Sequence, residues 1–507
     1  MGTEVELKLA TSKRGLSKAL SLPWLKKMAN GNIGKKQDLV SVYFDTHDFA
    51  LRDHGLSLRV RRVGEQRLQT VKANSPTPMG RREWEAEIDR DQPKLKLARH
   101  TALAPILNGD IGQHLKPVFE TCIRRMAIPL QVGRSEIELA LDEGRVLTGN
   151  ASLDIAEIEI ELKRGERSDI GRLARKLAQA VPLALSARAK ADWGYALAED
   201  SVNAPVSAEA IALAPSSSVA DAFVVIGFSC LRQIAGNTLA VRQRDPEGIH
   251  QMRVGLRRLR AAVSFFKEAL RGRESDGIKS QLKWLTEQLG PGRDADVFVS
   301  KSIVPCLKHH PDRLEFDVLA HDFERERSLG FAKAQAAVES KRFDRVLLDC
   351  ALWLIDGEWR NDNDDLRRAL RERAADAFAE EQLARRTRKI VKRIRKLERL
   401  DAARQHKLRI AVKKVRYSRE FFASINPDRR RKKDRREIDC ALKGLQSALG
   451  DLNDMRVHMY WAREFARSNA DARKAFAIGY VTGREDAYSH NALMKAVAAG
   501  KRLKNAA

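Results

Sequence analysis

Residues 157–163 read EIEIELK, an unbroken alternation of charged and aliphatic side chains, and residues 4–8, EVELK, repeat it near the start of the chain. Because successive side chains of a strand point to opposite faces, each run puts its charges on one face and its aliphatic groups on the other. Glutamates this dense on one face repel one another unless a cation lies between them. A divalent metal, which prefers oxygen ligands, suits that position. The two runs therefore predict strands that present carboxylates to a metal ion.

Shorter alternating runs continue through the first 200 residues and are separated by turn residues. Helical patterns interrupt them only at about 15–29 and 169–181. Seven or eight antiparallel strands with so few helices predict a barrel or a closed sheet. The strands are expected at 3–10, 39–45, 56–63, 67–72, 82–89, 135–142 and 154–163.

Charges of one sign are segregated onto particular predicted strands. Arg59 and Arg61 share one strand face, Lys72 lies on the next strand, and Glu83 and Glu85 follow. The simpler alternative is a sheet with one solvated face, because antiparallel sheets often face water on one side. A solvated face normally mixes the two signs, whereas segregation favours a closed sheet that sets glutamates against metal and cations against an anion. Transfer of a phosphoryl group needs both, since its oxygens must be neutralised while a water is positioned.

Length and composition bound the class of protein. With 507 residues and an apolar fraction of 43%, the chain is long enough for two or more domains with cores. No run of 18 or more apolar residues occurs and the N-terminal residues lack an apolar signal region, so we expect no membrane span and a cytoplasmic protein. The cysteines are scattered and form no CxxC pair, which argues for a reducing compartment and against disulfides or a zinc site. They are Cys122, Cys230, Cys306, Cys350 and Cys440.

The second half of the chain is helical and basic. Residues 201–217 are rich in Ala, Pro and Ser and predict a linker between a first domain, 1–200, and a second, 218–507. From about residue 218 onward, the apolar pattern has a period near 3.6, which predicts an all-α bundle. The formal net charge of +26 divides into +6 for residues 1–200 and +20 for the remainder. That basic half implies a polyanionic partner: nucleic acid, polyphosphate or an anionic membrane.

The helical half contains an internal duplication. Two sets of basic residues share the offsets 0, 3, 7, 8 and 10, and the spacing of Leu, Gly, Asp and Val in Leu289–Val297 recurs in Leu449–Val457. Such a repeat means one supersecondary unit used twice, here two related halves of a helical bundle. The basic sets are His250, Arg253, Arg257, Arg258 and Arg260, and then His406, Arg409, Lys413, Lys414 and Arg416.

Each basic set occupies one arc of its predicted helix, opposite an apolar stripe. The plain alternative is a solvated basic face, but two matched faces could line one groove for a polyanion. Aromatic residues make up only 6% of the chain and do not interleave with the basic ones, which argues against stacking platforms for nucleic acid. No zinc finger or RNA-recognition motif occurs, so no specific nucleic-acid partner is expected. Asp294 and Asp454, which follow Gly290 and Gly450, are expected to be helix caps rather than metal ligands.

A series of motifs runs through the first 200 residues: ExExK, YFDT at Tyr43–Thr46, LSLRVR, TxK at Thr70–Lys72, RREWE and ExExExK. In this order they resemble the CYTH domain of the triphosphate tunnel metalloenzyme family. The resemblance implies an eight-stranded antiparallel tunnel that binds a triphosphate-containing substrate with Mg²⁺ or Mn²⁺. By position it implies a metal-binding and water-positioning set of Glu4, Glu6, Glu157, Glu159 and Glu161, of which Glu4, Glu6 and Glu159 act with Lys8 in catalysis. It implies phosphate ligands at Lys8, Arg59, Arg61, Lys72, Arg82, Lys190 and, placed by neighbourhood only, Arg125.

One segment departs from the family pattern. The family usually closes with SKAxRGY, whereas residues 189–195 read AKADWGY. The lysine, glycine and tyrosine stay in place, but a serine and an arginine are lost. The implied site therefore lacks one hydroxyl and one cation.

The motif HxxRxxxRRxR, which occurs with LGxxRDxDV in the first copy and is matched in the second with LGDLNDMRV, resembles the CHAD domain. This helical module is associated with CYTH domains, and the resemblance covers about residues 218–507 and implies polyphosphate binding. The expected protein is α+β, with a β tunnel followed by a duplicated all-α bundle. It is expected to hydrolyse inorganic triphosphate or short-chain polyphosphate with a divalent metal. The alternatives are an adenylate cyclase or a thiamine-triphosphatase on the same site, or a non-catalytic protein that binds polyphosphate granules.

Overall fold

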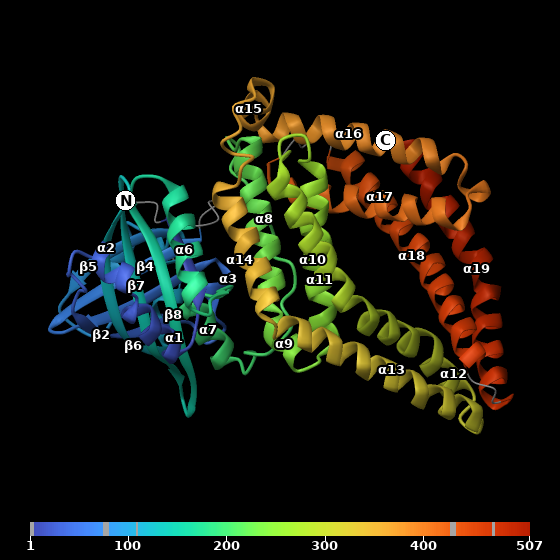
Figure 1. Ribbon diagram of the computed structural model, residues 1–507, viewed down its shortest axis with the longest axis horizontal. Coiled ribbons are helices and arrows are strands. Elements are labelled where there is room, and N and C mark those ends of the chain that lie inside the picture. The colour runs from blue at the N-terminus through green and yellow to red at the C-terminus, as the bar shows by residue number, and fades with distance from the viewer. Residues whose placement is uncertain (1–4, 75–80, 108–109, 426–431, 469–471, 507) are drawn as a thin grey trace. The chain divides into compact units, whose positions relative to one another are not determined.

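The chain forms two compact units, which are described separately (Figure 1). The computed structural model describes residues 5–74, 81–107, 110–425, 432–468 and 472–506. The first, which we call the sheet unit, gathers Met1–Val206, Leu231–Leu239 and Ser340–Asn361. The second, the helical unit, gathers Ser207–Cys230, Ala240–Glu339 and Asp362–Ala507. All five cysteines are free thiols, as their spacing predicts.

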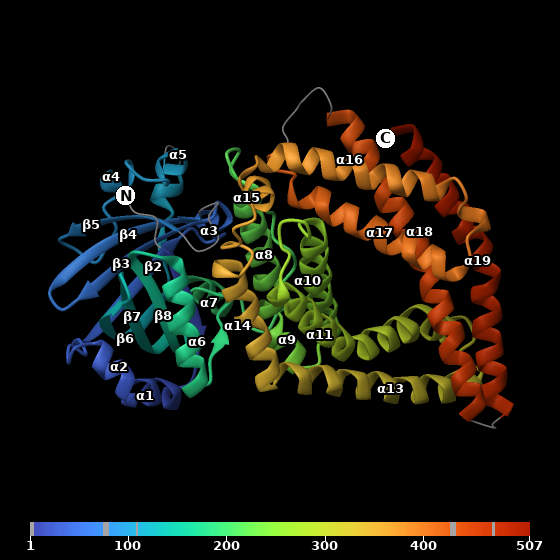
Figure 2. The same ribbon diagram turned by 45° about the horizontal axis from the view of Figure 1, so that its top comes forward.

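The sheet unit is built on one antiparallel sheet whose strands follow the order β5-β4-β3-β2-β6-β7-β8-β1-β9 and curl toward one face (Figure 2). The predicted antiparallel sheet is confirmed, with a short ninth strand added. The hydrogen-bonded ladder ends at β5 and β9, so within the described residues the sheet is not closed by backbone pairing. The strands are β1 (Val5–Ala10), β2 (Lys36–Asp45), β3 (Leu56–Val63), β4 (Gln66–Asn74), β5 (Arg81–Ile88), β6 (Lys116–Val132), β7 (Ser135–Thr148), β8 (Ala151–Arg164) and β9 (Ala184–Leu185).

Strand β6 is the long strand that the sequence patterns missed. It spans Lys116–Val132 and carries Pro117 and Pro129. Proline cannot donate to a ladder, and its presence in a run demotes a strand prediction. Here the strand still pairs with β2 on one side and β7 on the other. Long-range pairing therefore overrides the local signal.

The aliphatic face of the alternating runs is buried, as their period predicts. Leu9, Ile158 and Ile160 are each 0% exposed. Helices α1 (Lys13–Ser21) and α6 (Arg167–Ala180) contact β8. The charges of β1 and β8 consequently point to the other side of the sheet, which we call the charged face.

Helix α7 (Lys190–Ala198) covers part of the charged face. It contacts β6, β7 and β8, and its Ala191 and Tyr195 pack against Phe119, Ile123 and other apolar residues of the strands. The register places Ile123 opposite Gly144 and Arg125 opposite Asp142, so these apolar side chains and the charged ones share one face. The charged face is therefore apolar where α7 covers it. The charged side chains lie next to this apolar part, near Lys190 at the start of α7.

Short helices complete the sheet unit, and further helices of 5 to 37 residues follow in the chain. The short ones are α2 (Pro23–Met28), α3 (Ala50–Asp53), α4 (Leu95–Ala98) and α5 (Ala104–Leu107). The later ones are α8 (Val219–Gly236), α9 (Thr238–Arg242), α10 (Pro246–Phe265), α11 (Arg273–Phe298), α12 (Val304–His309), α13 (Leu314–Val338), α14 (Lys341–Asp356), α15 (Asp365–Glu372), α16 (Ala375–Ile394), α17 (Ala402–Phe421), α18 (Lys432–Ser468) and α19 (Ala472–Ala506).

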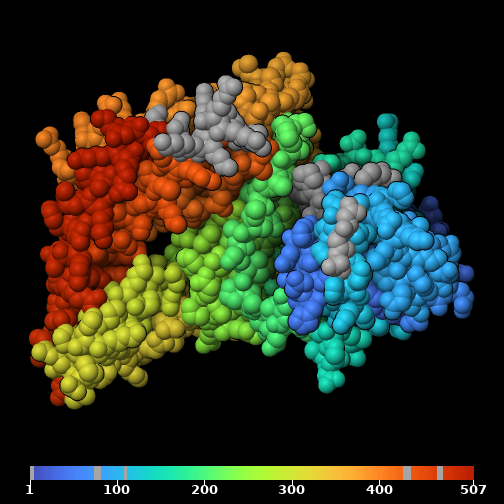
Figure 3. All heavy atoms as spheres, turned by 180° about the vertical axis from the view of Figure 1, so that it is seen from behind, coloured from blue at the N-terminus to red at the C-terminus, as the bar shows by residue number. Residues whose placement is uncertain are grey.

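The duplication in the helical unit is a pair of helix–helix repeats, α10–α11 and α17–α18. Helix α10 contacts both α11 and α17, and α17 contacts α18. The first helices begin identically: Asp245 Oδ1 accepts the Gly248 N–H at 2.8 Å, and Asp401 Oδ1 accepts the Arg404 N–H at 2.7 Å. An aspartate N-cap of this kind fixes where a helix starts. The two long helices α18 and α19 pack side by side (Figures 2 and 3).

One stretch, Val219–Arg242, is long and apolar enough to cross a membrane by length and composition alone. Its mean hydropathy is 1.4, and 72% of the window concerned is buried inside the protein. Such burial is what the core helix of a globular protein shows.

Candidate functional site

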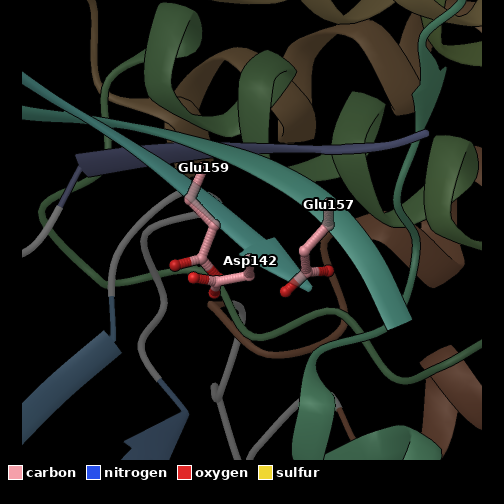
Figure 4. Close-up of side chains that lie close together, drawn as sticks. All are labelled: Asp142, Glu157 and Glu159. Atoms are coloured by element: carbon pink, nitrogen blue, oxygen red, sulfur yellow. The ribbon is translucent and has the colours of Figure 1, made fainter. Parts of the chain in front are cut away.

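Three buried carboxylates converge on the charged face: Asp142 of β7 with Glu157 and Glu159 of β8 (Figure 4). One oxygen from each lies within 4.8 Å of the others. The register explains the meeting, because Asp142 lies directly opposite Glu157 in the β7–β8 ladder. Asp142 is 0% exposed and Glu159 7%. We call these three residues the inner carboxylates.

Lys190, the first residue of α7, lies among the inner carboxylates. Its Nζ is 2.7 Å from Asp142 Oδ2 and 3.0 Å from Glu159 Oε1, and it also contacts Glu157. Burial alone would lower the pKa of this ammonium, but Glu159, Glu157 and Asp142 raise it well above its usual value. Lys190 is therefore a permanent cation of the site.

Arg125 of β6 holds the other side of the same cluster. Its Nε and Nη2 donate to Asp142 Oδ1 and Oδ2 at 2.8 and 2.6 Å, and Nη2 also donates to Glu159 Oε2 at 2.5 Å. Burial opposes the ionised form of Glu159, yet Lys190, Lys8 and Arg125 hold its pKa well below the usual range. Glu157 differs, because burial and Glu159 raise its pKa despite Lys190. The inner carboxylates thus divide into ionised and less acidic members.

A second row of carboxylates lies further along the same face. Glu6 of β1 is directly opposite Glu161 of β8, which is directly opposite Glu138 of β7. Like charges placed opposite one another are destabilising unless a cation intervenes. Lys163 Nζ lies 2.7 Å from Glu161 Oε2, and Lys8 Nζ lies 3.1 Å from Glu6 Oε1. We call Glu6, Glu138 and Glu161 the outer carboxylates.

A separate group of cations lies on β3 and β4. Arg59 and Arg61 lie opposite Tyr43 and Ser41 in the register with β2, and Lys72 Nζ lies 2.9 Å from Glu83 Oε2. Burial, with Arg59 next in size, lowers the pKa of Arg61 to about 10. Arg59 is only 8% exposed, and its Nε donates no hydrogen bond among the described residues. Cations this closely grouped favour a bound anion.

The structure brings most of the predicted site residues of the sheet unit together. One group lies on the part of the charged face formed by β1, β6, β7 and β8 with α7: Glu6, Lys8, Glu157, Glu159, Glu161, Arg125 and Lys190. The other group lies on β3 and β4 and consists of Arg59, Arg61 and Lys72. Glu4 lies outside the described residues.

Arg82 is the member that does not join the site. It lies opposite Ala73, on the face of β5 that carries Trp84, whereas Glu83 and Glu85 lie opposite Lys72 and Thr70 on the other face. The Arg82 guanidinium carbon is 5.7 Å from the centre of the Trp84 ring. As a phosphate ligand on the charged face Arg82 was wrongly predicted, because strand alternation sends it to the opposite side.

Asp142 is the inner carboxylate that sequence reasoning missed. The only signal in the sequence was that Asp142 is separated from Glu136 and Glu138 by even numbers of residues and so shares their strand face. That signal does not indicate that Asp142 lies opposite Glu157. The donor set of the inner and outer carboxylates consists of hard oxygen atoms, which is the chemistry that Mg²⁺ and Mn²⁺ prefer. Asp142, Glu157 and Glu159 would hold such a cation, with Glu6 and Glu161 in the adjacent row.

The helical unit has a matching pair of sites at its two repeats. Arg253 of α10 donates to the Leu289 and Gly290 carbonyls at 2.9 and 2.7 Å and contacts Asp294 at 3.3 Å. Its counterpart Arg409 of α17 contacts Asp454 at 3.5 Å. Both aspartates lie inside helices α11 and α18, so their expected role as helix caps was wrong. They hold an arginine of the preceding helix instead.

The two repeats bring their basic faces near each other. Burial first, then Arg409 and Arg257, lower the pKa of Lys413 to about 7, while Asp454 opposes them. Asp454 likewise contributes to raising the pKa of Asp294. Charges of both copies therefore act on one another. We call Arg253, Arg257, Arg409 and Lys413 the cationic cluster.

Arg260, Arg416 and Lys414 of the basic sets are exposed or half-buried, and each contacts a polar group of another helix. Arg260 contacts Thr286, and Arg416 contacts Gln446 at the equivalent place in the second copy. Lys414 donates to Ser264 Oγ at 3.1 Å.

His250 and His406 differ in their surroundings. Burial and Arg293 lower the pKa of His250 to about 4, so this ring is neutral at pH 7. His406 Nδ1 lies 2.6 Å from Asn453 Oδ1.

Arg258 is the clear exception among the predicted polyphosphate ligands. It is 0% exposed, its Nη2 lies 3.3 Å from Glu420 Oε1, and its guanidinium carbon lies 5.6 Å from the centre of the Phe421 ring. A side chain buried in this way cannot belong to a surface groove, so Arg258 was wrongly assigned to one.

Comparison with known proteins agrees with both halves of this description. The family model described as the CYTH domain matches residues 2–195, and the one described as the CHAD domain matches residues 226–463. The chain carries a CYTH domain followed by a CHAD domain. The CHAD match includes both repeats of the cationic cluster, and the CYTH match includes both carboxylate rows.

The proteins similar to this chain include a curated enzyme and a solved structure. An inorganic triphosphatase of Haemophilus influenzae is 30% identical over 200 residues, which is 38% of this chain and 54% of that protein. The chain therefore spans about half the length of this curated relative. The crystal structure of the CHAD domain from the plant Ricinus communis is 28% identical, covers 59% of this chain and 96% of that one, and superposes with a TM-score of 0.50. The second likeness supports the CHAD fold of the helical unit.

Proposed function

We propose that the CYTH domain hydrolyses inorganic triphosphate or short-chain polyphosphate with Mg²⁺ or Mn²⁺, in the cytoplasm. One observation carries the proposal: ionised carboxylates and a separate group of cations lie on one face of a single sheet. Phosphoryl transfer requires that combination, because several phosphate oxygens must be neutralised at once. Its similarity to an inorganic triphosphatase supports the choice of substrate.

The residues divide the work by charge. Arg59, Arg61 and Lys72 bind phosphate oxygens. They are cations on the charged face, and their own strands, β3 and β4, carry no row of carboxylates there. A divalent cation held by the carboxylates would neutralise further oxygens and make a bound water more acidic.

The first experiment measures phosphate release from triphosphate with Mg²⁺ or Mn²⁺ present. The variant Glu159→Gln keeps the shape of the side chain and removes a charge that Lys8, Lys190 and Arg125 contact. We expect a loss of at least about 100-fold in turnover, the scale on which a buried electrostatic group acts. Glu143→Gln is the matched control, because this half-exposed glutamate of β7 pairs only with Lys13 at 3.5 Å among the described residues.

The same assay decides between the enzyme classes that share these charges. Wild-type protein is incubated with triphosphate, ATP and thiamine triphosphate, and phosphate, pyrophosphate and cyclic AMP are followed. Preferred release of phosphate from triphosphate supports the proposal, and a chelator should abolish it until Mg²⁺ or Mn²⁺ is restored. Cyclic AMP as the main product would make the protein a cyclase. No product from any substrate would leave a binding protein.

We further propose that the CHAD domain binds polyphosphate through the cationic cluster. The supporting observation is that burial and then Arg257 of the first repeat lower the pKa of both Arg409 and Lys413 of the second, since cations grouped in this way are stabilised by an anion. Polyphosphate offers a charged backbone with no bases to read, which suits a cluster without stacking aromatic residues.

Direct binding of a fluorescent polyphosphate chain tests this second role. Arg257→Gln with Lys413→Gln should weaken binding by at least about tenfold, because two charge contacts are lost. Lys279→Gln with Lys283→Gln is the control for total charge, since both are exposed residues of α11, which pair with Asp276 at 2.9 Å and Glu287 at 3.7 Å. Equal weakening in the two double variants would mean that net charge alone attracts the chain.

A further inference from the structure

The buried carboxylate of Asp45, the last residue of β2, accepts four hydrogen bonds of 3.1 Å or shorter. Oδ1 accepts the N–H groups of Thr46 at 2.7 Å and Leu51 at 2.9 Å. Oδ2 accepts the N–H of Arg52 at 3.1 Å and the hydroxyl of Tyr195 at 2.7 Å. Three of these bonds come from the turn into α3 and the start of that helix. The fourth comes from Tyr195 of α7, which lies 150 residues later in the chain. Asp45 is 0% exposed, so the bond to Tyr195 is shielded from water.

The ring of Tyr195 packs against two aromatic rings of the sheet unit. Its centre lies 5.0 Å from that of Phe119 and 5.5 Å from that of Phe49, both edge-on. The preceding residue must be glycine, because a Cβ on Gly194 would lie 2.1 Å from the Phe119 ring. The C-terminal part of α7 is therefore fixed against β6 and β2.

The N-terminal end of α7 is held less well. Ala189 occupies the cap position and provides no side-chain hydrogen bond, although Asp192 Oδ2 accepts its N–H at 2.7 Å. An alanine cap stabilises the start of a helix less than a serine cap does. Lys190 then follows at the positive end of the helix dipole, where a cation is disfavoured. The place that family members fill with arginine holds Trp193, whose ring centre lies 4.6 Å from the Arg188 guanidinium carbon.

We propose that Asp45 and Tyr195 are positioning residues that place the ammonium of Lys190 among the inner carboxylates. Lys190 and Tyr195 are five residues apart on one helix, about 7.5 Å along its axis, so a helix fixed at Tyr195 fixes the reach of Lys190. Ala189 makes this tether more important here, since the helix start contributes little of its own. The consequence for turnover rests on the proposed function, whereas the placement of Lys190 does not.

The test uses the full-length protein and Tyr195→Phe, which removes the hydroxyl and keeps the ring contacts. Acetylation of Lys190 by an amine-reactive reagent is followed by mass spectrometry without substrate or metal, with Lys176 as the internal reference. We expect Lys190 to react about fivefold faster in the variant, the change that one hydrogen bond controls. Thr148→Val is the matched control, because it removes a hydroxyl bond to the Val118 carbonyl on β6 and leaves α7 untouched. It should leave the Lys190 rate unchanged.

A double-mutant cycle separates positioning from general loss of stability. Tyr195→Phe should lower triphosphate turnover in the wild-type background and have no further effect in the Lys190→Gln background. An equal loss in both backgrounds, or an unchanged acetylation rate in Tyr195→Phe, would overturn the inference. If wild-type protein hydrolyses no triphosphate, the proposed function fails while the acetylation result still decides the placement of Lys190.

Discussion

Arg125 of β6 and Asp142 of β7 meet through two parallel hydrogen bonds of 2.8 and 2.6 Å, which no other arginine–carboxylate pair on the charged face matches within the described residues. The two residues lie directly opposite in the β6–β7 ladder. A planar guanidinium fits a carboxylate in this two-pronged way and a lysine ammonium does not. Because Arg125 Nη2 also reaches Glu159, the pair links two of the three inner carboxylates.

Arg125→Lys is therefore expected to impair the site while keeping its charge. The variant loses at least one charged hydrogen bond, worth about 1.5–3 kcal/mol, and turnover of triphosphate should fall by roughly 10- to 100-fold. Phosphate release gives the turnover, and circular dichroism checks that the fold is kept. The matched substitution Arg124→Lys, on the opposite face of the same strand, alters a surface pair with Asp38 and should change turnover by less than about twofold. Equal effects of the two variants would contradict a special role for Arg125.

Asp142→Asn tests whether the inner carboxylates hold the divalent cation. The substitution keeps the size of the side chain and removes a fully buried charge. The affinity for Mn²⁺, measured by calorimetry, should fall by at least about tenfold, because neutral amide oxygen is a poorer ligand than carboxylate for a hard cation. Asp154→Asn, which changes an exposed pair with Arg145, serves as the control. Unchanged Mn²⁺ affinity in Asp142→Asn would place the cation at the outer carboxylates.

Residue patterns predict this sheet well because its information is local. The EIEIELK run has the period of a strand. The same period that directs Ile158 and Ile160 to the aliphatic side of the sheet directs Glu157 and Glu159 to the charged face. The prediction for Arg82 failed because Arg82 was assigned by motif and not by strand face.

Other features depend on contacts that no local pattern records. Asp142 joins the inner carboxylates only through its register with Glu157. Arg258 shares its repeat offset with Lys414, and that offset falls 80° from the first residue of the set, at the edge of the basic arc and about 100° from the apolar stripe, so the helix angle does not predict its burial. The two copies also differ in partners, because Arg258 meets Glu420 and Lys414 meets Ser264. Sequence offsets define a helix face, while burial depends on what packs against it.

Arg258→Met should consequently leave polyphosphate binding intact. The buried guanidinium contacts Glu420 and the Phe421 ring, and replacement of a buried charged side chain by an apolar one of similar volume is often neutral or stabilising. We expect polyphosphate affinity within about twofold of wild type and a small change in melting temperature. A loss of binding as large as that of Arg257→Gln with Lys413→Gln would contradict the interior position of Arg258.

The affinity for polyphosphate should depend on pH through Lys413. Burial, Arg409, Arg257 and Arg253 lower its pKa to about 7 in the absence of an anion, and Asp454 only partly opposes them. A bound polyanion favours the ammonium and raises this pKa, so binding takes up a proton as pH rises above 7. Affinity should therefore be highest below pH 7 and decrease from about pH 7 to 9, measured at constant ionic strength because salt also weakens polyanion binding. Lys413→Arg keeps the charge at every pH and should remove most of this decrease, while Lys279→Arg should retain it. The same decrease in Lys413→Arg as in wild type would assign the pH dependence to another group.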